Sequence, residues 1–347
     1  MASSPAHVTP DMQPTLVVHA DWGSAPNKRW MARAMLAGDG CYAAHSPEPA
    51  GEPGTLIRRL LADAGPSGSI LLGFDFPIGL PAHYARRVGA HDFLDLLPKL
   101  GQGEWSGFYA VAERPGQISL SRPFYPLRSG PKGQTRLRHL LDGLGLESAD
   151  DLRRCCERAR LGRRAACPLF WTVGGQQVGK AAICGWKQVL EPALCSGTNV
   201  AIWPFAGPLD ELYRPGRVVI AETYPAEFYT HLGVSFKRAG LGASPKDKVL
   251  SQSRSPLRSG KRVQRDRAAN AGALLAWARN ARVRPSPALQ AEIREGFGAS
   301  QEGEDRFDAA VGLMGMLNVV LKRRSPGDPG DEQIRKIEGW ILGQAAE

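Results

Sequence analysis

The sequence predicts an α/β protein in which buried strands of one sheet deliver acidic side chains to one edge. Short apolar runs bounded by glycine and proline have the composition of buried strands, and they lie at 15–20, 70–74 and 218–221. A carboxylate follows each run directly: Asp21, Asp75 and Glu222. Ligands of open α/β sheets bind outside the carboxyl ends of the strands, so these acids are expected to share one site.

The other elements follow from periodicity and turn residues. Segments 30–36 and 40–44 are expected to continue the first strand as a meander of antiparallel strands. Leucines at helical spacing predict a helix over 55–64, ahead of the central strand. Beyond Glu222, helices are expected at 226–232, 263–282, 288–297, 304–322 and 332–343.

Residues 15–343 are expected to form a single domain with a hydrophobic core, since the chain has 347 residues and 43% of them are hydrophobic. Residues 1–14 are small and polar, with prolines, and we predict a disordered lead-in. Segment 83–215 interrupts the sheet between two strands that end in acids, so we interpret it as a large, mainly helical insertion or cap. Helical patches and one strand are expected within it, at 90–100, 150–164 and 199–205.

The net charge of +10 favours an acidic partner, either nucleic acid or a phosphorylated substrate, although general solubility explains it equally well. None of the six cysteines forms a C-x-x-C pair or has zinc-finger spacing to a histidine, so we expect reduced thiols and a cytoplasmic location. The first residues lack the regions of a signal peptide, and no run approaches the ~18 apolar residues of a membrane span. No membrane is therefore predicted, and the oligomeric state stays open.

The helix expected over 304–322 carries two further acids. Asp305 and Asp308 are three residues apart and so lie on the same helical face. Ala309 and Ala310 are small enough to let this helix approach a sheet closely. The simpler explanation for Asp305 is a favourable charge in the first helical turn. For Asp21, Asp75 and Glu222 it is a solvated position at the end of a strand.

Together these acids match the layout that two-metal phosphodiester chemistry requires. Their hard oxygen atoms suit Mg²⁺ or Mn²⁺. Two ions about 4 Å apart would activate a water and stabilise the leaving oxygen. Without metal, packed carboxylates repel one another and some stay protonated. The expected catalytic residues are Asp21, Asp75, Glu222 and Asp308, and the expected metal ligands are these four with Asp305.

Four short motifs carry a resemblance to a known family. They are the strand ending in Asp21, GFDFPIGLP around Asp75, ETYPAEFY from Glu222 and DRFDAAVGL around Asp308. The chain resembles the family known as domain of unknown function 429, whose members are described as predicted nucleases, and the closing IEGWILG resembles the end of that family. The resemblance implies a ribonuclease-H-like fold with a mixed five-stranded sheet flanked by helices. It also implies that the four motif acids bind metal.

A basic segment from Lys246 to Arg267 carries eight basic residues and two acids. Contacts from such a segment to phosphates would give binding that depends on salt but not on base sequence. A solvated loop and helix face explains the segment equally well. The residues expected to contact nucleic acid are Arg258, Lys261, Arg262 and Arg265.

The predicted function is a metal-dependent nuclease that hydrolyses phosphodiester bonds, and two alternatives remain. A nucleotide-binding phosphotransferase or ATPase of the actin-like kinase type would use 21–24 as a phosphate loop with Lys28 nearby, but its second glycine-rich motif is not evident. Segment 172–182 (TVGGQQVGKAA) lacks the spacing and the hydroxyl of a P-loop. The other alternative is a non-catalytic nucleic-acid-binding module with the same fold.

Overall fold

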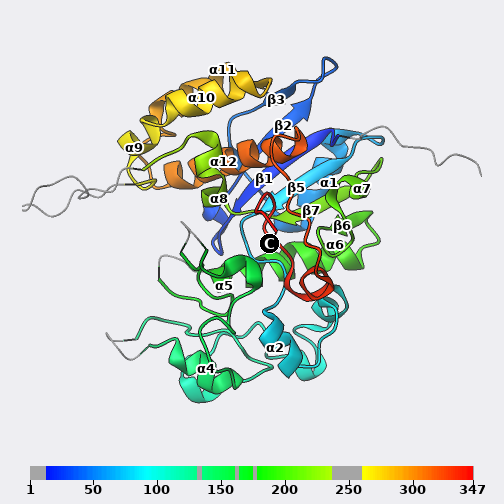
Figure 1. The fold of residues 1–347 in the computed structure, drawn as a ribbon, viewed down its shortest axis with the longest axis vertical. Coiled ribbons are helices and arrows are strands. Elements are labelled where there is room, and N and C mark those ends of the chain that lie inside the picture. Colours follow the sequence, from blue (N-terminus) through cyan, green and yellow to red (C-terminus); the bar gives the residue numbers. More distant parts are fainter. Residues whose placement is uncertain (1–12, 131–134, 161–163, 175–177, 237–259, 347) are drawn as a thin grey trace, which may run out of the picture.

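The computed structural model describes residues 13–346 except 131–134, 161–163, 175–177 and 237–259. Its centre is an eight-stranded mixed sheet of order β6-β7-β5-β1-β2-β3-β8, in which β4 also pairs with β2. Helices flank this sheet (Figure 1), so the predicted α/β class is confirmed. Residues 1–12 of the expected lead-in lie outside the described residues.

The middle of the sheet joins an antiparallel meander to parallel crossovers. β1 (Leu16–Trp22) pairs antiparallel with β2 (Arg29–Leu36), which pairs antiparallel with β3 (Tyr42–Ala44). This is the predicted meander. On its other side β1 pairs in parallel with β5 (Ile70–Phe74), which pairs in parallel with β7 (Val218–Glu222). The carboxyl ends of β1, β5 and β7 therefore lie at the same edge.

The pairing register brings the strand-end acids to nearly the same level. Ala20 pairs with Phe74, and Phe74 pairs with Glu222. Asp21 and Asp75 each come one residue after this row, and Asp21 is still inside β1, which continues to Trp22. The sequence prediction that these acids share an edge is confirmed.

The remaining strands lie towards the margins of the sheet. β6 (Val200–Ile202) pairs in parallel with β7 and accounts for the strand expected in 199–205. β8 (Val283–Pro285) pairs in parallel with β3, and β4 (Glu48–Pro49) pairs antiparallel with β2. These last two strands are not evident in the sequence, because they are very short and contain proline.

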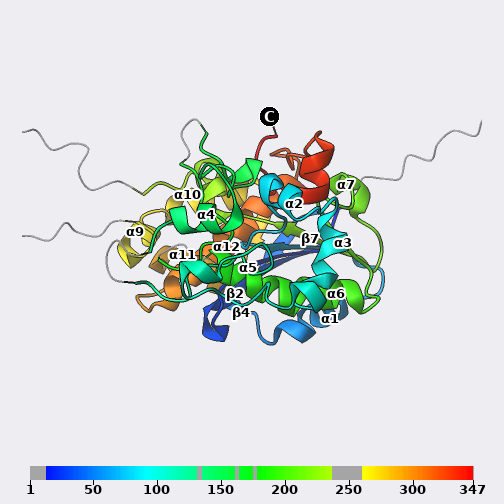
Figure 2. The ribbon, with the colours of Figure 1, turned by 90° about the horizontal axis from the view of Figure 1, so that it is seen from below.

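Helices pack on both faces of the sheet. One face is covered by α8 (Pro225–Leu232), α10 (Ala271–Asn280), α11 (Pro287–Glu295) and α12 (Glu302–Val320), with α9 (Gln264–Ala268) beside them. The other face packs against α1 (Pro53–Ala64) and a π-helical turn at Trp186–Leu190 that leads into α6 (Glu191–Cys195). Figure 2 shows α1 and α6 together on that side.

The segment between β5 and β6 gathers beyond the carboxyl ends of the strands (Figure 1). Its helices are short: α2 (Ala82–Arg87), α3 (Phe93–Leu96), α4 (Arg138–Leu144) and α5 (Val178–Gly185). After β6 comes α7 (Leu209–Leu212). Many side chains of the segment join the same hydrophobic core as the sheet, Trp186 and Phe93 among them. The division into one domain with an insertion over 83–215 stays a prediction.

Four helix predictions, at 55–64, 226–232, 288–297 and 304–322, are confirmed to within two or three residues. The helix expected over 263–282 is divided into α9 and α10. At 90–100, α3 passes into a 3₁₀ turn that contains Pro98. The helix expected over 332–343 is shorter, a π-helical turn at Ile334–Glu338.

The helix expected over 150–164 is wrong for the described part of that segment. It contains one 3₁₀ turn, Cys155–Glu157. The reason is tertiary: Arg154 and Glu157 are buried, and Arg154 binds groups on distant parts of the chain. These contacts require an irregular backbone here.

α12 is buried on all sides rather than on one apolar face: 15 of its 19 residues are buried. The helix can lie deep in the core because it carries glycines where it meets its neighbours. Gly312 lies against the ring of His19 in β1, and Gly315 against the ring of Phe228 in α8.

Gly312→Ala is expected to lower the free energy of unfolding by about 1–3 kcal/mol, because overpacking a tight contact displaces its neighbours. A Cβ atom at this position would overlap the buried His19 ring. Gly272→Ala in α10 is the control, since no atom lies within 4 Å of its added Cβ and alanine favours a helix. Urea denaturation measures both. Equal stability of the two variants would contradict this packing of α12 on β1.

Candidate active site

A cavity of about 900 Å³ lies at the carboxyl ends of β1, β5 and β7. One wall comes from the sheet ends and from α8 and α12, and it includes Asp75, Glu222 and Asp308. The opposite wall comes from the segment between β5 and β6, through Glu157 and Lys180 among others. The cavity is therefore enclosed by parts of the chain that are far apart in sequence.

Asp75 lines the cavity, and its carboxyl group hydrogen-bonds to that of Asp21, which is not among the lining residues. The Trp22 backbone N–H donates to Asp75 Oδ1 over 2.7 Å, which fixes the side chain after β5 against the end of β1. Burial, followed by repulsion from Asp75 and Asp308, raises the pKa of Asp21 well above its usual value. Burial likewise raises the pKa of Asp75 to about 6. Two neighbouring carboxyls with raised pKa values hold a proton readily and would release it to a cation.

Asp308 projects from α12 into the same site and already has two partners. Its Oδ2 accepts a hydrogen bond from the Lys261 ammonium, and its Oδ1 accepts one from the Tyr229 hydroxyl over 3.3 Å. Lys261 Nζ also lies 3.4 Å from Glu304 Oε1. Burial raises the pKa of Asp308, and the charge of Lys261 opposes that shift.

Asp305 lies one turn earlier on α12, at the margin of the site. Its Oδ2 accepts a hydrogen bond from Lys28 Nζ over 2.9 Å. Burial raises its pKa, and Lys28 opposes the shift. Both Asp305 and Asp308 add to the repulsion felt by Asp21. Asp21 therefore lies within range of the charges of Asp75, Asp305 and Asp308, and the role of these four acids as metal ligands stays a prediction.

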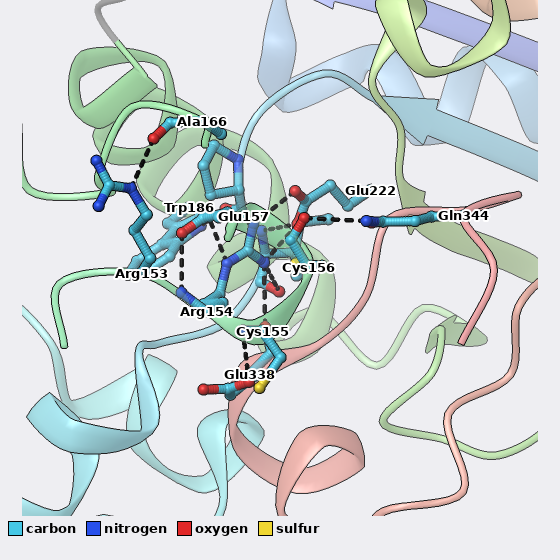
Figure 3. Close-up of polar contacts among 12 residues, drawn as sticks. Arg153, Arg154, Cys155, Cys156, Glu157, Ala166, Trp186, Glu222, Glu338 and Gln344 are labelled. Atoms are coloured by element: carbon cyan, nitrogen blue, oxygen red, sulfur yellow. Dashed lines mark hydrogen bonds and ion pairs between the residues drawn. The ribbon is translucent and has the colours of Figure 1, made fainter. Parts of the chain in front are cut away.

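Glu222 is the fifth, and it belongs to a different network (Figure 3). Arg154 donates to both of its oxygens, from Nη1 to Oε2 and from Nη2 to Oε1, each over 2.6 Å. The Ile78 backbone N–H donates a third hydrogen bond to Oε2 over 2.7 Å. Glu222 lines the cavity, but its oxygens are occupied, and its role as a metal ligand stays a prediction.

Arg154 is the functional neighbour that sequence reasoning missed. It is wholly buried and also donates to Glu157 Oε1, from Nε over 3.0 Å and from Nη2 over 2.8 Å. Its Nη1 reaches the backbone carbonyls of Ile78 and Glu338, each over 3.0 Å. One side chain thus ties the segment before β6 to the end of β7, to the loop after β5 and to the C-terminal segment (Figure 3). The only local feature that could have pointed to Arg154 is its spacing of three residues from Glu157. That spacing by itself favours an ion pair on a helix and not a buried network.

The basic residues predicted to contact nucleic acid have different surroundings. Lys261 lies against Asp308 and Glu304. Arg262 and Arg265 are exposed, with only distant ion pairs, at 3.7 Å to Glu304 and 3.5 Å to Asp266. Arg258 lies outside the described residues. Lys28 and Lys180 also line the cavity, so its walls carry cations as well as acids.

The donor set has the chemistry of a hard-metal site, because it consists of carboxylate oxygens. In the part of the chain that the structure describes, no group of three acidic, histidine or cysteine side chains is arranged closely enough to hold a metal ion. Lysine ammonium groups neutralise Asp305 and Asp308 instead. The paired carboxyls of Asp21 and Asp75 fit a divalent ion, which would replace the proton between them.

Two further findings limit other interpretations. None of the six cysteines, all of which lie in described segments, forms a disulfide, and their reduced state in the cell stays a prediction. Among the described helices, none combines the length and the apolar composition that crossing a bilayer demands. The cytoplasmic location stays a prediction.

Comparisons of the chain with protein-family models, with curated proteins and with solved structures give no match. The class of protein is therefore defined by geometry alone. It is a mixed α/β protein with an acidic, lysine-lined cavity at the carboxyl edge of its parallel strands.

Proposed function

We propose that this protein is a Mg²⁺- or Mn²⁺-dependent hydrolase that cleaves phosphodiester bonds in nucleic acid and has a ribonuclease-H-like fold. The observation that carries this proposal is the meeting of Asp21, Asp75 and Asp308, which come from β1, from the loop after β5 and from α12. Buried carboxylates that repel one another destabilise a fold unless they are paired or bind a metal.

Asp21 and Asp75 are the residues that would hold the metal ion. The chemistry that such an ion would supply is Lewis-acid polarisation of a phosphoryl oxygen and activation of a water molecule. Asp308 fixes Lys261 and Tyr229 at the opposite side of the site, through its two oxygens. In this position the Lys261 ammonium group would donate a hydrogen bond to a phosphate oxygen of the substrate. Arg154 keeps the cavity wall in place through Glu222 and Glu157.

The cavity supports an anionic substrate. The cations Lys180, Lys261 and Arg262 line it together with five acids, so phosphate oxygens would need a bound metal ion as well as these cations. The chain as a whole carries a net charge of +10. The sheet supports the proposed fold, since its five central strands combine an antiparallel meander, β1 to β3, with strands β5 and β7 parallel to β1. This is a mixed five-stranded arrangement, extended here at both edges.

No observation favours the two alternative functions to the same degree. A phosphate loop at 21–24 would need a free Lys28, but Lys28 is paired with Asp305. A non-catalytic module would have no need for the buried, mutually repelling acids.

The test is cleavage of labelled single-stranded and duplex DNA and RNA with Mg²⁺, with Mn²⁺ and with a chelator. We expect cleavage that requires a divalent ion. The binding of the same nucleic acids is measured in calcium buffer across a salt series. A protein that neither cleaves nor binds nucleic acid at low salt would contradict the proposal and point to a small phosphorylated substrate.

The double variant Arg262→Ala/Arg265→Ala is expected to lower the salt slope of nucleic-acid binding by about one for each phosphate that is no longer neutralised, and to weaken all sequences alike. Both side chains are more than 60% exposed, so their removal leaves the core unchanged. The control is Arg279→Ala/Arg294→Ala, which removes the same charge from exposed positions of α10 and α11. Identical slopes for both double variants would assign Arg262 and Arg265 to general solubility.

A further inference from the structure

We propose that the site holds a single divalent ion, between Asp21 and Asp75, and that Lys261 takes the place of a second ion at Asp308. This inference rests on the proposed function and changes the expected two-metal site into a one-metal site assisted by lysine. The geometry that carries it is the way in which each acid is already partnered.

The acids of the site divide into two groups by their charge partners. Lys261 pairs with Asp308 and Glu304, and Lys28 pairs with Asp305. Among the described residues, no lysine or arginine forms an ion pair with Asp21 or Asp75. These two carboxyls instead hydrogen-bond to each other. Lys261 is near enough to lower the pKa of Asp75, but in the described part of the site no cation lies within ion-pair distance of either carboxyl.

Both oxygens of Asp308 already have a partner. Its Oδ2 accepts from Lys261 and its Oδ1 accepts from the Tyr229 hydroxyl. Tyr229 is itself held in place, since its ring packs on those of Phe236 and Phe307, at centroid distances of 5.4 and 6.3 Å. A second divalent ion at Asp308 would have to displace the Lys261 ammonium group, and it would then lie close to that positive charge.

Lys261 is anchored through its backbone rather than carried on a free tether. Arg267 is 2% exposed and donates to the Lys261 carbonyl over 2.6 Å. The same guanidinium donates to the carbonyls of Gly296 and Gly298, over 2.9 and 2.7 Å, just after α11. The backbone N–H of Gly260 is held by Asp266 Oδ2 over 2.8 Å. The fold thus fixes the origin of this side chain beside α12, as a built-in cation requires.

The experiment is calorimetric titration of the full chain with Mn²⁺, with bound Mn²⁺ counted independently by electron paramagnetic resonance. We expect one ion in the wild type. Lys261→Met removes the charge while keeping most of the side chain, and it is expected to bind a second ion. Arg262→Met is the matched control, since Arg262 is adjacent and near Glu304 but does not contact Asp308, and it is expected to bind one ion.

Asp308→Asn supplies a second, independent measurement if Lys261→Met does not fold. It is expected to keep the single ion, because that ion is held by Asp21 and Asp75. Two ions in the wild type, or a single ion in a folded Lys261→Met variant, would overturn this inference and leave the proposed function intact. Release of the ion in a folded Asp308→Asn variant would also overturn it. A wild type that binds no Mn²⁺ at all would instead contradict the proposed function itself.

Discussion

Asp75→Asn is expected to abolish Mg²⁺-dependent cleavage of nucleic acid while the protein stays folded. The substitution keeps the Oδ1 acceptor that binds the Trp22 N–H, so the loop after β5 keeps its position. It removes the charge of one of the two carboxyls that would hold the ion, and a metal contributes several kcal/mol of transition-state stabilisation, which corresponds to a rate decrease of about a hundredfold or more. The measurement is the cleavage rate of a single-stranded and a duplex substrate under saturating Mg²⁺.

The stability of the same variant separates a functional acid from a structural one. Because burial raises the pKa of Asp75 to about 6, the carboxyl is ionised at neutral pH, but its ionisation costs more free energy in the folded protein than in the unfolded chain. A neutral asparagine should therefore leave the free energy of unfolding unchanged or increase it. Asp63→Asn, on the exposed surface of α1, is the control for charge removal and should retain full activity. Wild-type activity in Asp75→Asn would exclude a catalytic role for Asp75, and a failure to fold would make it a structural residue.

Arg154→Ala is expected to lower the free energy of unfolding by about 3–5 kcal/mol, because removing one partner of a buried ion pair leaves the other charge unpaired. Here two carboxylates, of Glu157 and Glu222, are left without their only described ion-pair partner. The carbonyls of Ile78 and Glu338 are deprived of a donor at the same time. Urea denaturation at neutral pH gives the difference from the wild type.

The loss of unfolding free energy caused by Arg154→Ala should become smaller as the pH is lowered towards about 5. Burial already raises the pKa of Glu222, and without Arg154 it is raised further, so protonation of Glu222 removes an unfavourable charge. Arg138→Ala is the control: its ion pair with Asp142 is on the surface, and such pairs contribute about 0.3–0.5 kcal/mol. An effect of Arg154→Ala no larger than that of the control would mean that the network in Figure 3 does not hold the cavity wall together.

The residues of the site that could be predicted from the sequence are those whose position in the fold follows from the few residues around them. An apolar run predicts a buried strand, and the acid that follows it must come to the carboxyl edge, as Asp21 and Asp75 do. Asp305 and Asp308 share a helical face because of their spacing, and the small residues after them allow close packing on β1. In each of these cases the information lies within a few consecutive residues.

The partners of these acids could not be predicted in the same way. Arg154 and Glu222 are 68 residues apart, and Lys261 and Asp308 are 47 apart. In sequence both the arginine and the lysine have the pattern of solvated, helical or basic surfaces. Their burial depends on how the segment before β6 and the turn after α11 pack, which no local pattern specifies.

The sequence by itself therefore determined the α/β class, the shared edge of β1, β5 and β7, and the acids that gather there. Only the tertiary structure decided which partner each of these acids has. In the folded protein, lysines pair with Asp308 and Asp305, and Arg154 pairs with Glu222. Asp21 and Asp75 hydrogen-bond to each other. The physical reason is that strand and helix periodicity is a local property of the chain, whereas burying a charge requires a partner that only folding can bring near.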